Sequence, residues 1–200
     1  GVVYDDDMGT NSGSVTIYNY NGYNWEEIQK IVAFDGEEYD YFANSLDLYG
    51  DRLVVSSFHD DIEDVNMGSA YVYKSEDFIF EYITKIQAAD ASMNDNFGLA
   101  VSLYENWIAV GSLNNDNGIN SGSVYLYELE NDEIENYTKI IASDGTAYDE
   151  FSISIALGYN NLLVGAHFDD DLGDDSGSVY IYQYIGCGYN YACNYNDEIL

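Results

Sequence analysis

Basic residues are scarce in this chain. Its 200 residues include 5 Lys and Arg against 37 Asp and Glu, a formal net charge of −32 at pH 7. Such a charge repels both the phosphate backbone of nucleic acids and an anionic membrane surface, so we expect neither as a partner. The excess of carboxylates indicates either a solvated acidic surface or specific binding of divalent cations, calcium above all.

Long apolar runs and reactive side chains are also lacking. No apolar run approaches the roughly 18 residues that span a bilayer, so we expect no direct membrane insertion. The two histidines, His59 and His167, lack a Ser or Cys nucleophile signature, and we expect no enzyme. Cys187 and Cys193 lie close together, and a short disulfide loop between them would indicate an oxidising compartment.

The feature that decides the fold is an internal repeat of about 54 residues. A Gly-Ser strand pattern begins at Gly13, Gly68, Gly122 and Gly177, with spacings of 55, 54 and 55 residues. Two further markers keep this register. They are the aromatic residues Phe42, Phe97 and Phe151, and the pairs Lys30-Ile31, Lys85-Ile86 and Lys139-Ile140.

Each unit is predicted to form four short antiparallel strands, because the Gly-, Asn- and Asp-rich links are too short for helical crossovers. In one unit we expect strands over 97–103, 107–111, 123–127 and 137–141. The second strand is apolar without alternation, as in Leu53-Val54-Val55, so both faces of the sheet must be covered. Small sheets covered on both faces and repeated at this period are typical of the blades of a β-propeller, an all-β fold. A β-helix would need shorter rungs, and a sandwich would not repeat so regularly.

The repeat resembles the FG-GAP repeat of integrin alpha chains and many bacterial surface proteins. The resemblance rests on Ala142-Ser143-Asp144-Gly145, Asp149-Glu150-Phe151 and the acidic loop that begins at Gly165-Ala166-His167. Phe97-Gly98 keeps the Phe-Gly pair that gives the repeat its name. The chain has no proline, so Gly165-Ala166-His167 replaces the Gly-Ala-Pro part of the name. The resemblance implies a propeller, usually seven-bladed, in a protein that is extracellular or on the cell surface and serves adhesion or recognition.

The register predicts the organisation of the chain. We expect a partial blade over 1–39, complete blades over 40–94 and 95–148, a partial blade over 149–185 and a Cys-containing tail over 186–200. Gly1 falls inside a repeat, so no targeting segment is expected at this end. The blades should form an open arc, and residues 1–200 alone should associate through their uncovered faces.

The best candidate metal site is the acidic loop between the second and third strands. Carboxylates and Asn carbonyls on a tight Gly turn are the hard oxygen ligands that calcium prefers, but the same residues also favour turns without any metal. The calcium loop of integrin-like blades precedes the second strand, where this chain has only short turns such as Tyr49-Gly50-Asp51. The candidate ligands are Asp5, Asp6, Asp7, Asp60, Asp61, Asp64, Asn115, Asp116, Asn117, Asp169, Asp170 and Asp171.

A second set of acids recurs at a spacing of five in the links between blades. We expect these acids to cap backbone amides, with the repeated lysines as their counterions. The pairs are Asp35 and Asp40, Asp90 and Asp95, and Asp144 and Asp149.

Three functions fit this sequence. The first is an adhesion or recognition module that binds a protein ligand through its loops. The second is a lectin-like propeller that binds a glycan in pockets between blades, and the third is an accessory or spacer propeller of a larger secreted enzyme. Fold alone does not choose among them.

Overall fold

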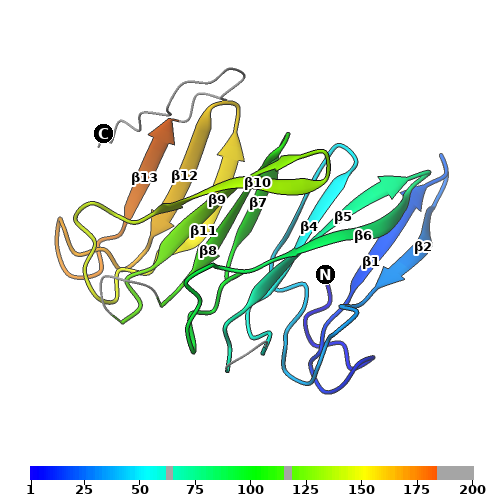
Figure 1. The fold of residues 1–200 in the computed structure, drawn as a ribbon, viewed down its shortest axis with the longest axis horizontal. Coiled ribbons are helices and arrows are strands. Elements are labelled where there is room, and N and C mark those ends of the chain that lie inside the picture. Colours follow the sequence, from blue (N-terminus) through cyan, green and yellow to red (C-terminus); the bar gives the residue numbers. More distant parts are fainter. Residues whose placement is uncertain (62–64, 115–118, 184–200) are drawn as a thin grey trace.

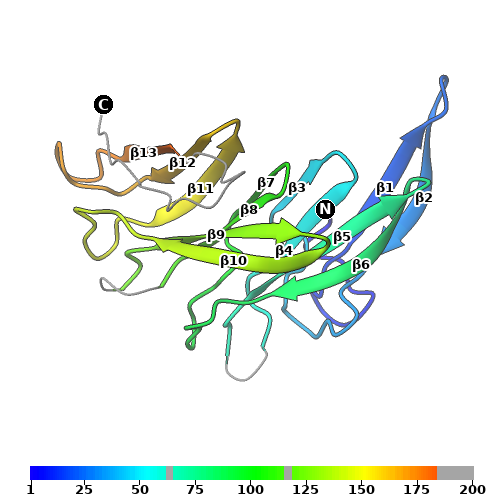
Figure 2. The ribbon, with the colours of Figure 1, turned by 45° about the horizontal axis from the view of Figure 1, so that its top comes forward.

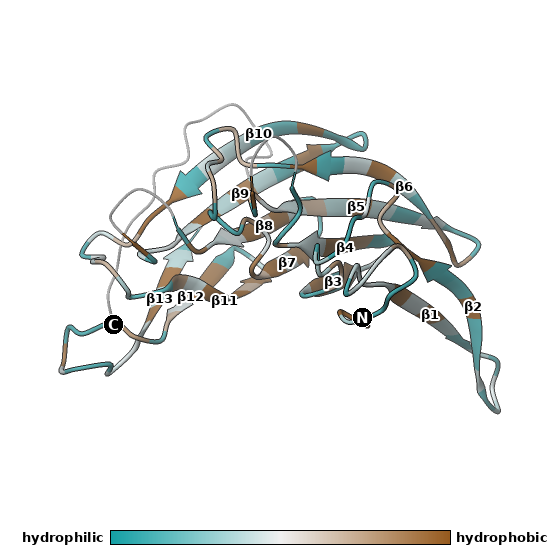
Figure 3. Ribbon diagram, turned by 90° about the horizontal axis from the view of Figure 1, so that it is seen from below, coloured by the Kyte–Doolittle hydropathy of each residue, from teal (hydrophilic) through white to brown (hydrophobic). Residues whose placement is uncertain are grey.

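The computed structural model describes residues 1–61, 65–114 and 119–183, and within them it contains strands, turns and loops but no helix. No helix that could cross a membrane occurs in this part of the chain. The strands form four antiparallel sheets that stand side by side in chain order (Figure 1). Seen from below, the row of sheets curves into an open arc (Figure 3). The four sheets are therefore blades of an open propeller arc, as the repeat predicts.

The strands of each blade follow one another in sequence, and each pairs with its chain neighbours. Blade 1 has two strands, blades 2 and 3 have four each, and blade 4 has three among the residues described. Their bounds are β1 (Val15–Tyr20) and β2 (Trp25–Ile31); β3 (Leu46–Tyr49), β4 (Arg52–Ser57), β5 (Ser69–Glu76) and β6 (Ile79–Ile86); β7 (Val101–Tyr104), β8 (Trp107–Ser112), β9 (Ser123–Glu130) and β10 (Glu133–Ile140); β11 (Phe151–Gly158), β12 (Asn161–Ala166) and β13 (Ser178–Gln183).

Three strand boundaries differ from the prediction by more than one residue, and one of them is the end of β9, at Glu130 and not at 127. β7 begins at Val101 and not at 97, because the amides of Gly98 and Leu99 both donate to the Gly111 carbonyl and interrupt the ladder. β10 begins at Glu133 and not at 137. Its polar first half follows a two-residue turn, Asn131-Asp132, in which both residues have positive φ, as a tight hairpin matched to the strand twist requires.

The core consists of three layers of side chains, each between two neighbouring blades. In every layer a fully buried Phe packs edge-on against a Tyr of the third strand, with ring centroids 5.2 to 5.4 Å apart. These edge-to-face pairs are Phe42 with Tyr71, Phe97 with Tyr125, and Phe151 with Tyr180. β4 and β8 contribute buried side chains to the layers on both of their faces, which explains why they are apolar without alternation. Figure 3 shows brown apolar segments along the central strands.

Polar contacts also join the blades. At the inner strands, the Asp47 carboxylate accepts hydrogen bonds from the Ser102 hydroxyl (3.0 Å) and the Leu103 amide (2.8 Å). At the tip of the β9–β10 hairpin, the Asp132 carboxylate forms ion pairs with Arg52 at 3.1 Å and Lys74 at 2.7 Å, both from blade 2. This hairpin reaches over the neighbouring blade (Figure 2). Blades 2 and 3 are thus held together by polar contacts as well as through the core.

One face of blade 4 is not covered by the residues described. Val179 and Ile181 of β13 are 67% and 36% exposed. The residues at the same repeat positions in blades 2 and 3 are at most 1% exposed, because the next blade covers them. These residues are Ala70, Val72, Val124 and Leu126.

Candidate functional site

The two ends of the blades differ. At the hairpin end, uppermost in Figure 1, strands are joined by short turns such as Gly50-Asp51 and Asn131-Asp132. The opposite end, which we call the loop end, carries the acidic loops after the second strands and the links between blades. Because loops carry most binding residues in folds of this kind, the loop end is the candidate binding region.

The loop end is held together by hydrogen bonds between successive repeats. In blade 2, the amides of Tyr39, Tyr41 and Phe42 donate to the carbonyls of Thr10, Asn11 and Ser12 at 2.8 to 3.1 Å. The same three bonds recur between blades 2 and 3 and between blades 3 and 4. The links between blades therefore have a fixed conformation.

That conformation requires left-handed backbone at alternate residues. Blade 3 places Asn94, Asn96 and Gly98 there, and these residue types tolerate positive φ. Blade 2 instead has Tyr39 (φ 68°) and Tyr41 (φ 54°), for which this conformation is strained.

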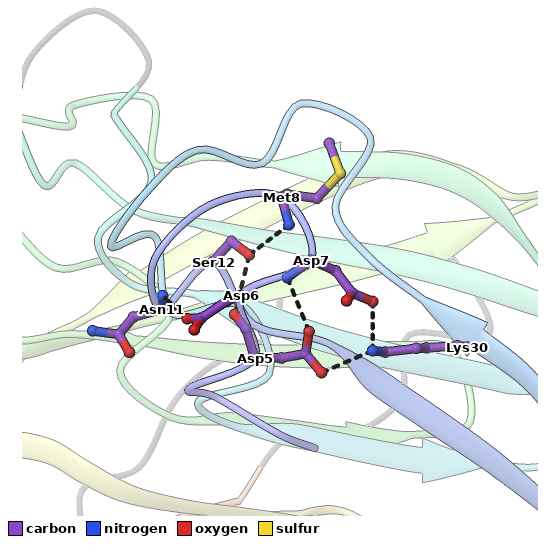
Figure 4. A network of polar contacts seen from close by, with 7 residues as sticks. All are labelled: Asp5, Asp6, Asp7, Met8, Asn11, Ser12 and Lys30. Carbon is purple, nitrogen blue, oxygen red and sulfur yellow. Dashed lines mark hydrogen bonds and ion pairs between the residues drawn. The ribbon is translucent and has the colours of Figure 1, made fainter.

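The first acid of each acidic loop points inward and binds a side chain of its own repeat. Asp5 accepts from Lys30 at 2.8 Å (Figure 4), and this contact lowers the pKa of Asp5. Asp60 is buried, lies 2.7 Å from Lys85, and also accepts a hydrogen bond from the Ser69 hydroxyl. Asp169, equally buried, accepts from the Tyr180 hydroxyl at 2.6 Å.

The second acid of each loop caps a backbone amide five residues further on. Asp6, Asp61 and Asp170 accept from the amides of Asn11, Asn66 and Asp175 respectively, at 2.5 to 2.8 Å. This is the turn role that the sequence offered as the alternative to calcium.

The third acids differ from loop to loop. Asp7 lies 2.5 Å from Lys30 (Figure 4). The pKa of Asp171 is raised by the nearby charges of Asp169 and Asp144. The other predicted ligands, Asp64, Asn115, Asp116 and Asn117, lie outside the described residues, as do Cys187 and Cys193.

The described part of the acidic loops does not fit a metal ion as it stands. Within residues 1–61, 65–114 and 119–183, no group of three or more His, Cys, Asp or Glu is arranged to hold one. Most of the loop carboxylates described above are already bound to lysines, hydroxyls or backbone amides. Calcium binding stays a prediction of the sequence.

Three of the six acids between the blades cap backbone amides, as the sequence predicts. Asp40, Asp95 and Asp149 each accept a hydrogen bond from the backbone amide three residues earlier, at 2.6 to 2.7 Å. The other three, Asp35, Asp90 and Asp144, instead accept hydrogen bonds from the hydroxyls of Tyr71, Tyr125 and Tyr180. Burial raises the pKa of Asp40 to about 7, although the hydrogen bond that it accepts from the Glu37 amide acts in the opposite direction.

Two of the repeated lysines join consecutive repeats. Lys85 binds Asp35 at 2.7 Å, and Lys139 binds Asp90 at 2.5 Å. Burial acts against the charge of Lys85, but the bonds to Asp35 and Asp60 outweigh it and raise the pKa of the lysine. Lys30 instead binds the acidic loop of its own repeat.

An aromatic cluster at the loop end was not predicted from the sequence. It consists of Tyr41 and four rings around it. Tyr41 stacks on Phe58 with ring centroids 5.6 Å apart, and its ring centroid lies 5.1 to 6.5 Å from those of Tyr4, Tyr39 and His59. Tyr4 and Tyr39 are 72% and 50% exposed. Burial lowers the pKa of His59, against the opposing effect of the Asp61 charge. The one available signal was that Tyr39 and Tyr41 occupy positions where blade 3 has asparagine.

The other histidine is a surface residue. His167 is 44% exposed at its side chain, lies against Phe168 with ring centroids 3.8 Å apart, and is 3.6 Å from the Glu150 carboxylate.

Comparison with known proteins agrees with this geometry. The family model of the FG-GAP repeat matches residues 25–73, 80–127 and 135–182, well over half of the chain. The chain belongs to the FG-GAP repeat family. Each matched FG-GAP unit runs from the outer strand of one blade to the third strand of the next, for example from β2 to β5. The comparison with curated proteins found no match to the chain.

Proposed function

We propose that this FG-GAP chain is an extracellular recognition module that binds a protein ligand through the loop end of its blades. FG-GAP repeats typically occur in extracellular proteins and suggest a recognition or adhesion role. The observation that carries the proposal is the aromatic cluster around Tyr41. Exposed tyrosines grouped around a central ring are characteristic of the residues that dominate binding energy in protein interfaces.

The fold does not explain why tyrosine occupies positions 39 and 41. Each left-handed tyrosine costs about 1 to 2 kcal/mol relative to a residue that accepts this conformation. Blade 3 forms the same link with Asn94 and Asn96, so the fold does not need tyrosine there. Blade 4 has the same strain at Tyr148 and Glu150, so the strain is shared by two links, and it is the grouping of rings around Tyr41 that distinguishes blade 2.

Charge indicates the chemistry of the ligand. The exposed acids Asp6, Glu37, Glu38 and Asp61 lie in the same loops as the aromatic cluster. A ligand surface with Lys or Arg would be attracted to these carboxylates and could also stack on the tyrosine faces. We therefore propose a cationic protein surface as the ligand.

Asparagine variants test the proposal without damaging the fold. Tyr39→Asn and Tyr41→Asn should leave the melting temperature unchanged or raise it, because asparagine accepts the left-handed conformation. Binding to an array of Lys- and Arg-containing peptides should fall at least tenfold, and binding by the unmodified protein should weaken with salt. The matched control is Tyr148→Asn, at the same repeat position as Tyr39 but in blade 4, with φ 77° and 58% exposure.

The array also separates the alternatives. Unchanged peptide binding by both asparagine variants would contradict the proposal. Absence of binding to any peptide or glycan would favour the accessory or spacer role.

A further inference from the structure

A cleft of about 530 Å³ opens between the outer strands of blades 2 and 3. It lies between β6 and β10, on the outer side of the arc and away from the aromatic cluster. Its polar and aromatic lining consists of Thr84, Lys85, Gln87, Tyr127, Asp132, Glu133 and Tyr137. The ammonium group of Lys85 is already paired with Asp35 and Asp60.

Comparison with the neighbouring pair of blades explains why the cleft exists. Between blades 1 and 2, the Gln29 side chain accepts from the Phe80 amide and donates to the Phe80 carbonyl, both at 2.8 Å, which ties the outer strands β2 and β6 together. The residue at the position of Gln29 in the next repeat is Thr84, and Ile134 stands at the position of Phe80. A threonine side chain is too short to bridge the two strands, so they stay apart.

The walls of the cleft are held in place by other contacts. Asp132 is fixed by Arg52 and Lys74. The Tyr127 hydroxyl donates to the Gln87 carbonyl at 3.2 Å, and the Tyr127 ring stacks on Tyr137 with centroids 5.7 Å apart and planes at 30°. A cleft with walls fixed in this way loses little entropy when a ligand binds.

The lining indicates the ligand class. Tyr137 is 52% exposed and offers an aromatic face beside the carboxylates of Asp132 and Glu133. The Glu133 carboxylate has no hydrogen-bond or ion-pair partner among the residues that the structure describes, so it is available to accept hydrogen bonds. A sugar ring has an apolar C–H face for the tyrosine and hydroxyl donors for the carboxylates.

We propose that this cleft binds a neutral pyranose unit of a glycan. Glu133 and the net charge of −32 disfavour sulfated or uronic sugars. This site is independent of the protein-binding loop end proposed above.

The test uses saturation-transfer NMR on residues 1–200 with the methyl glycosides of glucose, galactose and mannose. We expect transfer from at least one of them at about 10 mM, since single sugars bind weakly. Tyr137→Ala and Glu133→Gln should each weaken binding at least tenfold. Thr84→Gln should restore the tie seen at Gln29, close the cleft and abolish binding without lowering the melting temperature.

The control variant is Tyr23→Ala, 89% exposed on the β1–β2 hairpin, which should bind sugar as the unmodified protein does. No transfer from any neutral glycoside, or unchanged binding by Thr84→Gln and Tyr137→Ala, would overturn the proposal. Preference for a sulfated or uronic glycoside would overturn it as well.

Discussion

The Nζ atom of Lys85 lies 2.7 Å from the carboxylate of Asp35, in the link that leads from blade 1 to blade 2. The same ammonium group lies 2.7 Å from Asp60, in the acidic loop of blade 2. One lysine thus binds two acids from different repeats, and its side chain is only 14% exposed. In a chain with so few cations, this contact is important for stability.

Removal of that lysine should destabilise the protein. Lys85→Met leaves the Asp60 carboxylate, 5% exposed at its side chain, without a cation, and we expect a loss of about 2 to 4 kcal/mol. Lys30→Met, at the same repeat position but exposed, should cost less. Urea unfolding of both variants measures the difference, and equal losses would contradict a special role for Lys85.

Glycine at the start of the third strand should be required for steric reasons and not only for its positive φ. A Cβ at Gly68 (φ 83°) would lie 2.0 Å from the Phe97 carbonyl oxygen, whereas one at Gly22 (φ 96°) would meet nothing within 4 Å. Gly22→Ala therefore has the conformational cost alone, about 1 kcal/mol. Gly68→Ala should lose more than about 3 kcal/mol or fail to fold, because backbone would have to move. Thermal unfolding compares the two variants. Similar melting temperatures would show that the backbone at Gly68 does not pass as close to that of Phe97 as the structure indicates.

Asp40 should make stability depend on pH. Its pKa is about 7 in the folded protein and 3.8 ordinarily, so the folded state keeps a proton that the unfolded chain releases between these values. The free energy of unfolding should therefore fall as pH rises from 3.8 to about 7, by at most about 4 kcal/mol from this group.

The Asp40 contribution is isolated by substitution. Asp40→Asn should have a flatter dependence in that window than the unmodified protein. Asp77→Asn, which removes one charge from an exposed hairpin turn, is the control and should leave the slope unchanged. Identical slopes for all three proteins, in urea at constant ionic strength, would assign the pH dependence to other carboxylates.

Calcium should raise the melting temperature if the acidic loops bind it, as the sequence predicts. The mutual repulsion of Asp171, Asp169 and Asp144 is one place where a divalent cation would relieve unfavourable charge. We expect calcium to stabilise more than magnesium, which demands a tighter octahedral shell, and Asp171→Asn to reduce the calcium effect. Sodium at matched ionic strength is the control; equal stabilisation by sodium would mean that screening was the whole effect.

Residues 1–200 expressed alone should associate in solution. The apolar face formed by Val179 and Ile181 is exposed, whereas the matching faces of blades 2 and 3 are covered by the next blade. Val179→Lys combined with Ile181→Lys should lower the apparent mass in light scattering, because charge opposes contact between apolar faces. A stable monomer from the unmodified chain would contradict association through this apolar face.

The sequence alone was sufficient for the blade architecture. The spacing of Gly13, Gly68, Gly122 and Gly177 indicated repeated units, and the unbroken apolar second strands indicated sheets covered on both faces. The amide-capping acids, such as Asp40, were also predictable from sequence, because a cap depends on residues only a few positions apart. Periodicity and local turn chemistry are short-range properties, so they can be read without coordinates.

Only the tertiary structure decided which repeats meet and how closely. The cleft at Tyr137 depends on whether residue 84 can reach across to β10, and the aromatic cluster depends on rings from three separate segments meeting around Tyr41. The left-handed backbone at Tyr39 runs against the preference of tyrosine and is imposed by hydrogen bonds to a loop of the preceding repeat. Contacts between repeats depend on the twist and spacing of the blades, and the sequence pattern of a single repeat does not predict these.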